Sequence, residues 1–163
     1  MRLPWDDLWM AIAVLYSSRS SCLYYHVGAV IIRDKHMLSG GYNGAVAGDV
    51  NCCEVGCAKE VDGKRLPPGS AFCRGAHAEM NAMNFAKCDL TGADIYTTVR
   101  PCLDCVKQII QQGIRKVVYL EDYDGDSMAV EMLKRNGVQL IPFSDISKTT
   151  FDDFHLIYQK MRK

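Results

Sequence analysis

The chain has 163 residues, a hydrophobic fraction of 48%, and 19 basic against 19 acidic side chains. A length of this order fits a single domain, here residues 1–163, built around one hydrophobic core. The zero formal net charge gives no broad basic surface for nucleic acid, and no apolar run approaches the roughly 18 residues that cross a membrane. We therefore expect neither nucleic acid nor a membrane as a partner.

The N-terminal segment has apolar residues at helical spacing between Leu8 and Leu15. Asp6 and Asp7 interrupt its apolar stretch, which is unlike a secretory signal. The segment is therefore interpreted as a first amphipathic helix of a cytoplasmic protein, or of one in the host cytoplasm if the source is viral. Thiols stay reduced in that compartment, so the eight cysteines favour metal binding over disulfides.

The rest of the chain changes character near residue 76. Before it, strands are predicted at residues 27–33 and 37–41 around a turn, followed by a long loop at about residues 45–75 that is rich in Gly, Pro and Cys. A loop of this length needs something to hold it, and metal ligation would do so. After it, helices at 76–87, 101–112, 127–135 and 148–161 alternate with strands at 93–99, 116–121 and 137–143. This alternation predicts an α/β fold with some parallel pairing.

Two short motifs carry the chemistry: HAE at residues 77–79 and PCLDC at residues 101–105. Cys102 and Cys105 lie on one side of a predicted helix start, so they can meet one metal ion with His77 as a third ligand and leave a fourth position for water. Glu79 is then expected beside that water as the general acid and base. Each residue alone has an ordinary explanation, such as a buried histidine, a first-turn carboxylate or a closed structural site. The complete set, in this order, favours catalysis.

Together with GYNG at residues 41–44, these motifs resemble the zinc-dependent cytidine and deoxycytidylate (dCMP) deaminases of phages and bacteria, over residues 5–145. The resemblance implies a three-layer α-β-α sandwich with a central mixed five-stranded sheet. It also implies hydrolysis of dCMP to dUMP and ammonia by a zinc-activated water, which supplies dUMP for thymidylate synthesis. Glu79 would carry the proton to N3 of the base and then to the leaving amine.

The resemblance also suggests how the nucleotide is held. Backbone amides near Ala78 and Cys102 would surround the base, and Asn43 would bind the sugar. The alternative for Asn43 is a plain turn residue. Tyr123 either lines the nucleotide pocket or is an ordinary half-buried tyrosine.

The 5′-phosphate needs donors near the first predicted strand. Arg19, Tyr24 and His26 are the candidates, and the residues alone do not decide among them.

A second, structural zinc occurs in many relatives of this type, and the resemblance assigns Cys22, Cys52, Cys57 and Cys73 to it. Cys53 is the alternative to Cys52. A closed site of four thiolates would stabilise the long loop. The other explanation is that these cysteines are buried free thiols, which pack as small hydrophobic side chains.

Assembly and regulation rest on the resemblance alone. It implies a homo-hexamer activated by dCTP and inhibited by dTTP, with Mg accompanying the triphosphate. A Gly-rich turn at Gly40, Gly41 and Gly44 is expected to offer amides to phosphates. Phe85 is either an interface residue or, on spacing, a core residue, and Cys88 is expected in the core.

Other functions are a deaminase of another nucleotide or of tRNA adenosine, and a non-catalytic zinc-binding module for assembly or competence-type functions. A tRNA deaminase usually needs a basic surface, which the net charge does not indicate. A riboflavin-pathway deaminase often carries a reductase domain, for which the chain is too short. A purely structural site has no use for Glu79.

Overall fold

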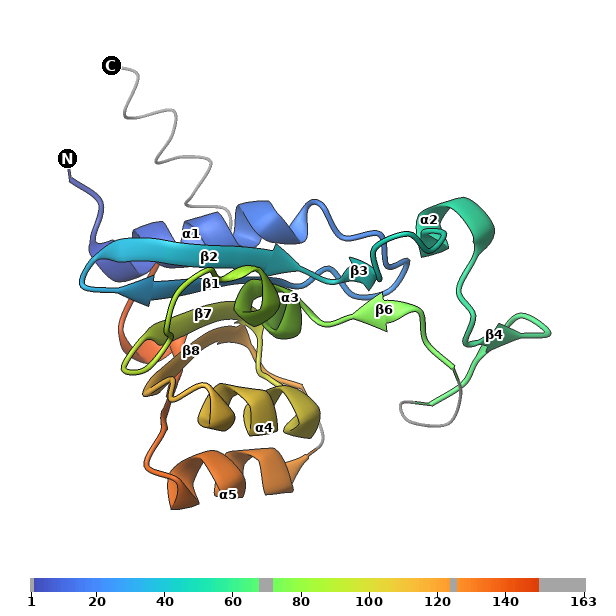
Figure 1. Ribbon diagram of the computed structural model, residues 1–163. Helices are drawn as coiled ribbons and strands as arrows, with labels where there is room; N and C mark the ends of the chain where they lie inside the picture. The colour runs from blue at the N-terminus through green and yellow to red at the C-terminus, as the bar shows by residue number, and fades with distance from the viewer. Residues whose placement is uncertain (1, 68–71, 124–125, 150–163) are drawn as a thin grey trace.

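The computed structural model describes residues 2–67, 72–123 and 126–149. Its centre is a five-stranded sheet with the strand order β2-β1-β7-β8-β9 (Figure 1). β1 is antiparallel to β2 and β7, whereas β7, β8 and β9 run parallel. The strands are β1 (Gly28–Arg33), β2 (His36–Tyr42), β7 (Asp94–Val99), β8 (Lys116–Glu121) and β9 (Gln139–Pro142).

Helices cover both faces of this sheet. Ala29 and Ile31 of β1 point into the layer of α3, α4 and α5, whereas Val30 and Ile32 point toward α1, because side chains alternate along a strand. The predicted α-β-α sandwich with a mixed five-stranded sheet is confirmed. The helices are α1 (Trp5–Ser17), α3 (Ala78–Phe85), α4 (Leu103–Gln111) and α5 (Ser127–Arg135).

The β1–β2 hairpin turns at Asp34 and Lys35, as predicted. Both residues have positive φ, 53° and 62°. Two such residues in a two-residue loop match the right-handed twist of the strands.

Gly41 lets α3 approach β2 closely, since a Cβ there would lie 2.4 Å from Ala78 O and from Ala82 N. The expected Gly-rich turn is wrong for Gly40 and Gly41. Both are strand residues paired with β1, and Gly44 opens the short strand β3 (Gly44–Ala45). Backbone packing, rather than phosphate binding, explains the absence of a side chain at Gly41.

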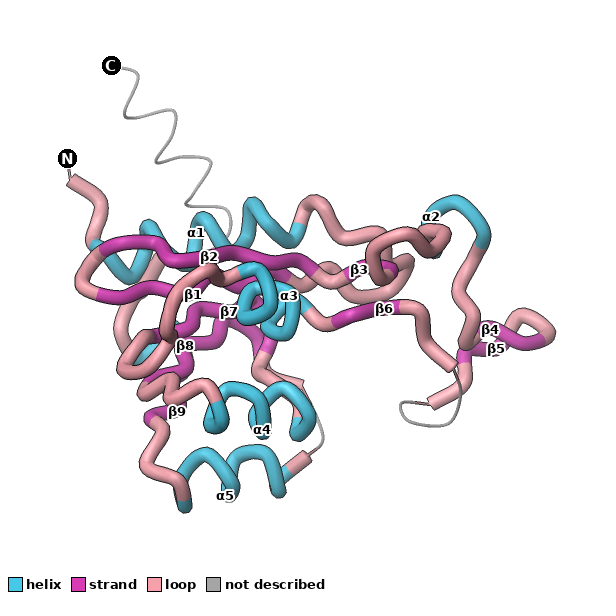
Figure 2. The backbone as a smooth tube through the Cα atoms, viewed as in Figure 1, coloured by secondary structure: helices cyan, strands magenta, loops and turns pink. Residues whose placement is uncertain are grey.

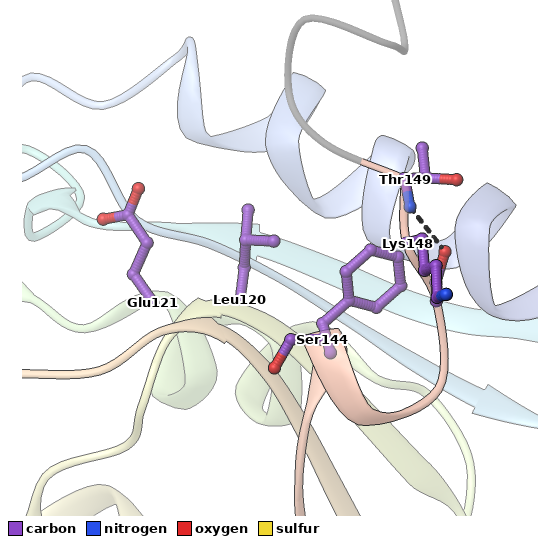
Figure 3. A pocket seen from close by; sticks show the side chains of 7 residues that line it. Leu120, Glu121, Ser144, Lys148 and Thr149 are labelled. Carbon is purple, nitrogen blue, oxygen red and sulfur yellow. Dashed lines mark hydrogen bonds between the residues drawn. The ribbon is translucent and has the colours of Figure 1, made fainter.

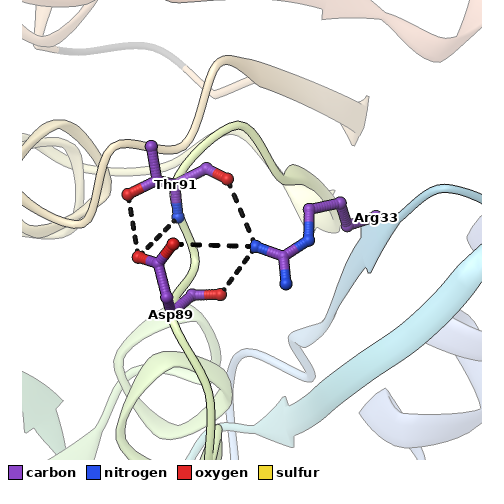
Figure 4. A network of polar contacts seen from close by, with 3 residues as sticks. All are labelled: Arg33, Asp89 and Thr91. Carbon is purple, nitrogen blue, oxygen red and sulfur yellow. Dashed lines mark hydrogen bonds and ion pairs between the residues drawn. The ribbon is translucent and has the colours of Figure 1, made fainter.

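The helix after HAE is shorter than predicted and ends at Phe85. Phe85 is 64% exposed, which excludes the core alternative for it, and Cys88 is also exposed, so the core position expected for Cys88 is wrong. The connection that follows lies near the end of β1: Arg33 Nη1 donates to the carbonyls of Asp89 (2.8 Å) and Thr91 (3.3 Å) (Figure 4).

Between residues 44 and 76 the described chain extends away from the sheet, and we call this part the cysteine-rich lobe (Figures 1 and 2). β3 pairs with β6, and β4 pairs with β5. The expected loop therefore contains short regular elements but no helix longer than four residues among its described residues. They are α2 (Cys52–Val55), β4 (Glu60–Val61), β5 (Lys64–Arg65) and β6 (Gly75–Ala76).

A hollow of about 440 Å³ lies on the α1 face of the sheet, at the ends of β8 and the short 3₁₀ helix Phe143–Asp145 (Figure 3). Thr149 Oγ1 closes one side by donating to Asp7 Oδ2 at 2.7 Å. From residue 150 onward the last predicted helix lies outside the described residues. None of the described helices has the length and apolar character needed to cross a bilayer.

Candidate metal centre and active site

Two helix starts bring the predicted ligands together. His77 is the N-cap of α3, and Cys102 is the N-cap of α4, with Cys105 in the first turn that follows. His77 Nδ1 lies 3.3 Å from Cys105 Sγ and 3.4 Å from Cys102 Sγ. All three ligand atoms lie within 4.8 Å of one another, the only such group of His, Cys, Asp or Glu in the described part of the chain.

The electrostatics of this group favour a thiolate. A hydrogen bond with Cys105, and a further one with His77, lowers the pKa of Cys102 to about 4. The same bond to Cys102, together with burial, raises the pKa of Cys105, and contact with Cys102 raises the pKa of His77. A helix N-terminus also favours negative charge. One imidazole nitrogen and two sulfurs around one point fit zinc with three protein ligands.

Glu79 stands in the first turn of α3 and is only 4% exposed. Burial raises the pKa of Glu79 above its ordinary value. A buried carboxyl group beside the ligands is suited to accept a proton and pass it on during general acid and base catalysis. Glu79 lies outside the three-residue ligand group, which suits a proton carrier better than a ligand.

Asn43 uses both ends of its amide within the chain. Oδ1 accepts from Val27 N at 2.8 Å, and Nδ2 donates to Tyr25 O at 2.8 Å. The side chain therefore fixes the segment that leads into β1. Its proposed contact with the sugar stays a prediction.

The three candidates for binding the 5′-phosphate lie in different environments. Tyr24 donates its hydroxyl to Glu60 Oε2 at 2.6 Å, and its ring lies under Arg65, 4.5 Å from the guanidinium carbon. Arg19 and His26 are exposed. Tyr24 is thus engaged with the cysteine-rich lobe, and none of the three is singled out as a phosphate ligand.

Ala78 and Tyr123 flank the ligands. Ala78 is fully buried as the first residue of α3, where backbone N–H groups lack partners within the helix. Tyr123 follows β8. Burial, and then the charge of Cys102, raises the pKa of its phenol.

The cysteines assigned to a second zinc are less closely gathered. Cys52 is buried, and burial followed by the charge of Cys57 raises its pKa, with a smaller contribution from Cys22. Cys53 is exposed, which favours Cys52 over it as a ligand. Cys73 is exposed and borders Gly75. The second site stays a prediction.

Three residues near the ligands were not anticipated from the sequence. Arg100, which is 7% exposed, directly follows β7 just before the Pro-Cys motif and is paired with Asp122. Asp126 Oδ2 accepts a hydrogen bond from Leu103 N at the start of α4 (2.9 Å). The only signal was a charged residue directly after a buried strand. Its partners lie more than 20 residues further on, so only the fold reveals them.

The sequence matches the family described as the cytidine and deoxycytidylate deaminase zinc-binding region over residues 3–121. The chain belongs to this family. Its predicted resemblance is therefore confirmed, and with it membership of a class of zinc-dependent deaminases.

Individual relatives agree with this placement. ComE operon protein 2 of Bacillus subtilis is 42% identical over 142 residues, which cover 84% of this chain and 70% of the relative. Deoxycytidylate deaminase of Saccharomyces cerevisiae is 38% identical over 146 residues, 88% of this chain, yet the match spans only 46% of the yeast protein.

Among solved structures, dCMP deaminase of the cyanophage S-TIM5 in complex with dCMP and dUMP superposes with a TM-score of 0.71 at 29% identity. The match covers 87% of this chain and 98% of the phage chain.

Proposed function

We propose that this deaminase hydrolyses dCMP to dUMP and ammonia and so supplies dUMP for thymidylate synthesis. The convergence of His77, Cys102 and Cys105 beside the buried Glu79 is the observation that carries the proposal. Support for the substrate comes from relatives named for dCMP and from the cyanophage enzyme that binds dCMP and dUMP.

The residues divide the work by chemistry. His77, Cys102 and Cys105 would hold the zinc, which supplies an ionised water near neutral pH. Glu79 would accept a proton from the water at its carboxylate and donate it to N3 of the base, and would then carry the proton of the hydroxyl group added at C4 to the departing amine. One water enters and one ammonia leaves, so Glu79 ends in its starting state. The backbone N–H of Ala78 would orient the base, with Asn43 at the sugar and Tyr123 at the pocket wall.

The lobe is proposed to hold a second, structural zinc through Cys22, Cys52, Cys57 and Cys73. The backbone N–H of Cys53 donates to Ser21 O at 3.1 Å, so the segments that carry Cys52 and Cys22 lie side by side, which supports the assignment. Such a site would give the lobe the stability that its short elements lack, because metal binding free energy becomes folding free energy.

Regulation completes the proposal. We infer a homo-hexamer in the cytoplasm, activated by dCTP with Mg and inhibited by dTTP, as the family resemblance implies. The exposed Phe85 on α3 is a candidate for a subunit contact.

A non-catalytic zinc module is the second candidate, because the most identical relative reported above carries an operon name rather than an enzyme name. The two are separated by Glu79, since only an enzyme needs a buried proton carrier beside three ligands. A deaminase of tRNA adenosine or of another nucleotide is a third outcome of the same assay.

The test is zinc content together with ammonia release from dCMP, with and without dCTP and Mg, and from dCTP, deoxycytidine and tRNA. Turnover of dCMP with zinc bound supports the proposal, and stimulation by dCTP supports the regulation. Zinc without turnover of any nucleotide would favour the non-catalytic module.

A further inference from the structure

A buried arginine stands two residues before the ligand Cys102. Arg100 is 7% exposed, and its backbone N–H donates to Glu121 O at 2.9 Å. Its side chain makes three further contacts with the two residues after β8. Nε pairs with Asp122 Oδ1 at 2.5 Å, Nη2 donates to Tyr123 O at 3.1 Å, and the guanidinium carbon lies 4.8 Å from the centre of the Tyr123 ring. A buried charge is costly unless it is paired and hydrogen-bonded, so these contacts account for its presence.

The ring that Arg100 contacts carries an unused polar group. Tyr123 Oη is buried and has no hydrogen-bond partner among the residues that the structure describes. The stacked Arg100 places the Tyr123 ring against the residue that stands two positions before the ligand Cys102. A phenol that is buried without a partner favours a ligand that can complete its hydrogen bond.

The contacts of Arg100 differ from those of an ordinary surface ion pair. Asp122 is 59% exposed, so the ion pair by itself contributes little. What the guanidinium adds is geometry, because its planar fork can bind a carboxylate and a carbonyl while it stacks on a ring. All three groups belong to neighbouring residues, so one side chain fixes both the backbone and the ring of Tyr123.

We propose that Arg100 is a positioning residue that fixes the ring of Tyr123, keeps its buried hydroxyl available to the nucleotide and thereby sets the affinity for the nucleotide. Arg100 acts through Tyr123 and does not touch the substrate. This inference rests on the proposed function for its kinetic readout, but the position of the Tyr123 ring can be measured without substrate.

The kinetic test compares Arg100→Gln, Arg100→Lys and Tyr123→Phe in the zinc-loaded enzyme. Loss of one hydrogen bond to a bound ligand corresponds to roughly a tenfold change. We therefore expect Tyr123→Phe and Arg100→Gln each to raise KM for dCMP about tenfold, with kcat changed less and zinc content unchanged. The double variant should be no worse than the poorer single one, because both changes remove the same contact. Arg100→Lys should not rescue, since an ammonium cannot reproduce the fork.

Arg115→Gln is the matched control. Arg115 Nε also pairs with an aspartate, Asp94, at 2.9 Å, but at the other end of β7. Its loss should leave KM unchanged. If Arg100→Gln fails to fold, Asp122→Asn removes the ion pair from an exposed partner, and a smaller rise in KM of about twofold to threefold is expected from a weakly coupled surface charge.

The structural test places 3-fluorotyrosine at position 123 and records its ¹⁹F resonance without nucleotide. Arg100→Gln should move this resonance toward that of a solvent-exposed tyrosine, whereas Arg115→Gln should leave it in place. An unmoved resonance, or additive effects of the two substitutions on KM, overturns the inference. Failure of the wild-type enzyme to deaminate dCMP would instead count against the proposed function, and the ¹⁹F result would still decide the role of Arg100.

Discussion

The metal centre and the cysteine-rich lobe use the same chemical groups in opposite structural settings. His77, Cys102 and Cys105 stand on helix starts that are packed against a buried sheet, and their ligand atoms converge to within 4.8 Å. The lobe carries Cys52 and Cys53 on a four-residue helix, whereas Cys57 and Cys73 lie in the connections between its short elements. In the described part of the chain, its thiols do not form a comparable group.

The two settings differ in what fixes the positions of the ligand side chains. Packed cores hold side chains in fixed rotamers, so the first site is preorganised by the fold. The lobe exposes apolar side chains, including Val46, Val55 and Phe72, and so buries little surface of its own. A metal ion in the lobe would therefore contribute to the folding stability of the lobe, because the ligands are not held in place before the metal binds.

The largest effect is expected for Glu79→Gln, which removes the proton carrier but keeps the shape of the side chain. General acid and base catalysis contributes about 10²–10⁴-fold, so kcat for dCMP should fall by at least that factor. Zinc content and melting temperature should remain near those of the wild type, because the ligands are untouched. Steady-state kinetics and metal analysis check both parts.

Glu131→Gln is the control for this substitution, since Glu131 is an exposed residue of α5. It should behave as the wild type. Turnover that survives in Glu79→Gln would contradict the assignment of Glu79 and return the centre to a structural role.

The second prediction contrasts the two sets of cysteines. Cys57→Ser should release the proposed lobe zinc and lower thermal stability first, with zinc per chain falling from two to one. Cys105→Ser should abolish turnover through loss of the other ion. Metal analysis and thermal unfolding on the same samples distinguish the two, and Cys88→Ser, an exposed thiol, serves as the control. A Cys57→Ser protein with unchanged metal content and stability would argue against a zinc in the lobe.

The third prediction concerns the close packing of α3 against β2 at Gly41. Gly41→Ala would press a methyl group onto the backbone of Ala78 and Ala82, and overpacking of this kind costs about 1–3 kcal/mol. Because α3 presents His77, zinc affinity should fall together with the free energy of unfolding. Chemical denaturation and zinc titration measure these two quantities.

Gly75→Ala in the lobe is the matched control, since its added Cβ would meet only ordinary contacts, Cys73 Sγ at 3.6 Å and Gly44 O at 3.8 Å. It should change neither quantity much. Equal losses in both variants would show that the approach of α3 to β2 is not what positions the ligand.

The sequence predicted the metal centre better than the lobe for the same physical reason. Hydrophobic spacing predicts the strands and helices after residue 76. The three ligands follow from the HAE and PCLDC motifs, and the mixed five-stranded sheet follows from the family resemblance that these motifs carry. The lobe has no such period, and its β3–β6 and β4–β5 pairs join residues that no pattern connects. Gly41 was misread because a close helix approach and a phosphate-binding turn call for the same residue. Arg100 was missed because its partners are adjacent only in the folded chain.

We expect the smallest effects on stability from replacing one arginine in each region: Arg33→Gln at the sheet and Arg65→Gln in the cysteine-rich lobe. Arg33 joins the end of β1 to the connection before β7, but the sheet beneath it is buried on both faces. Its loss should lower the melting temperature by no more than about 2 °C, which is the scale of an exposed pair in a protein of this size.

Arg65 stacks on the rings of both Tyr24 and Tyr25, 4.5 Å and 4.8 Å from their centres, and so joins β5 to the segment that carries Cys22. Cation–π contacts at exposed sites contribute about 0.5–1 kcal/mol each. This is small beside the stabilisation of a packed core, but it is a large fraction of the stabilisation of a lobe with few buried residues. We therefore expect Arg65→Gln to leave the melting temperature of the sheet nearly unchanged while it opens the lobe to limited proteolysis. Mass spectrometry of the fragments would locate the cuts. Cleavage that is equally rapid in both variants would mean that the lobe is as firmly held as the sheet, and that its cysteines need no metal to stay in place.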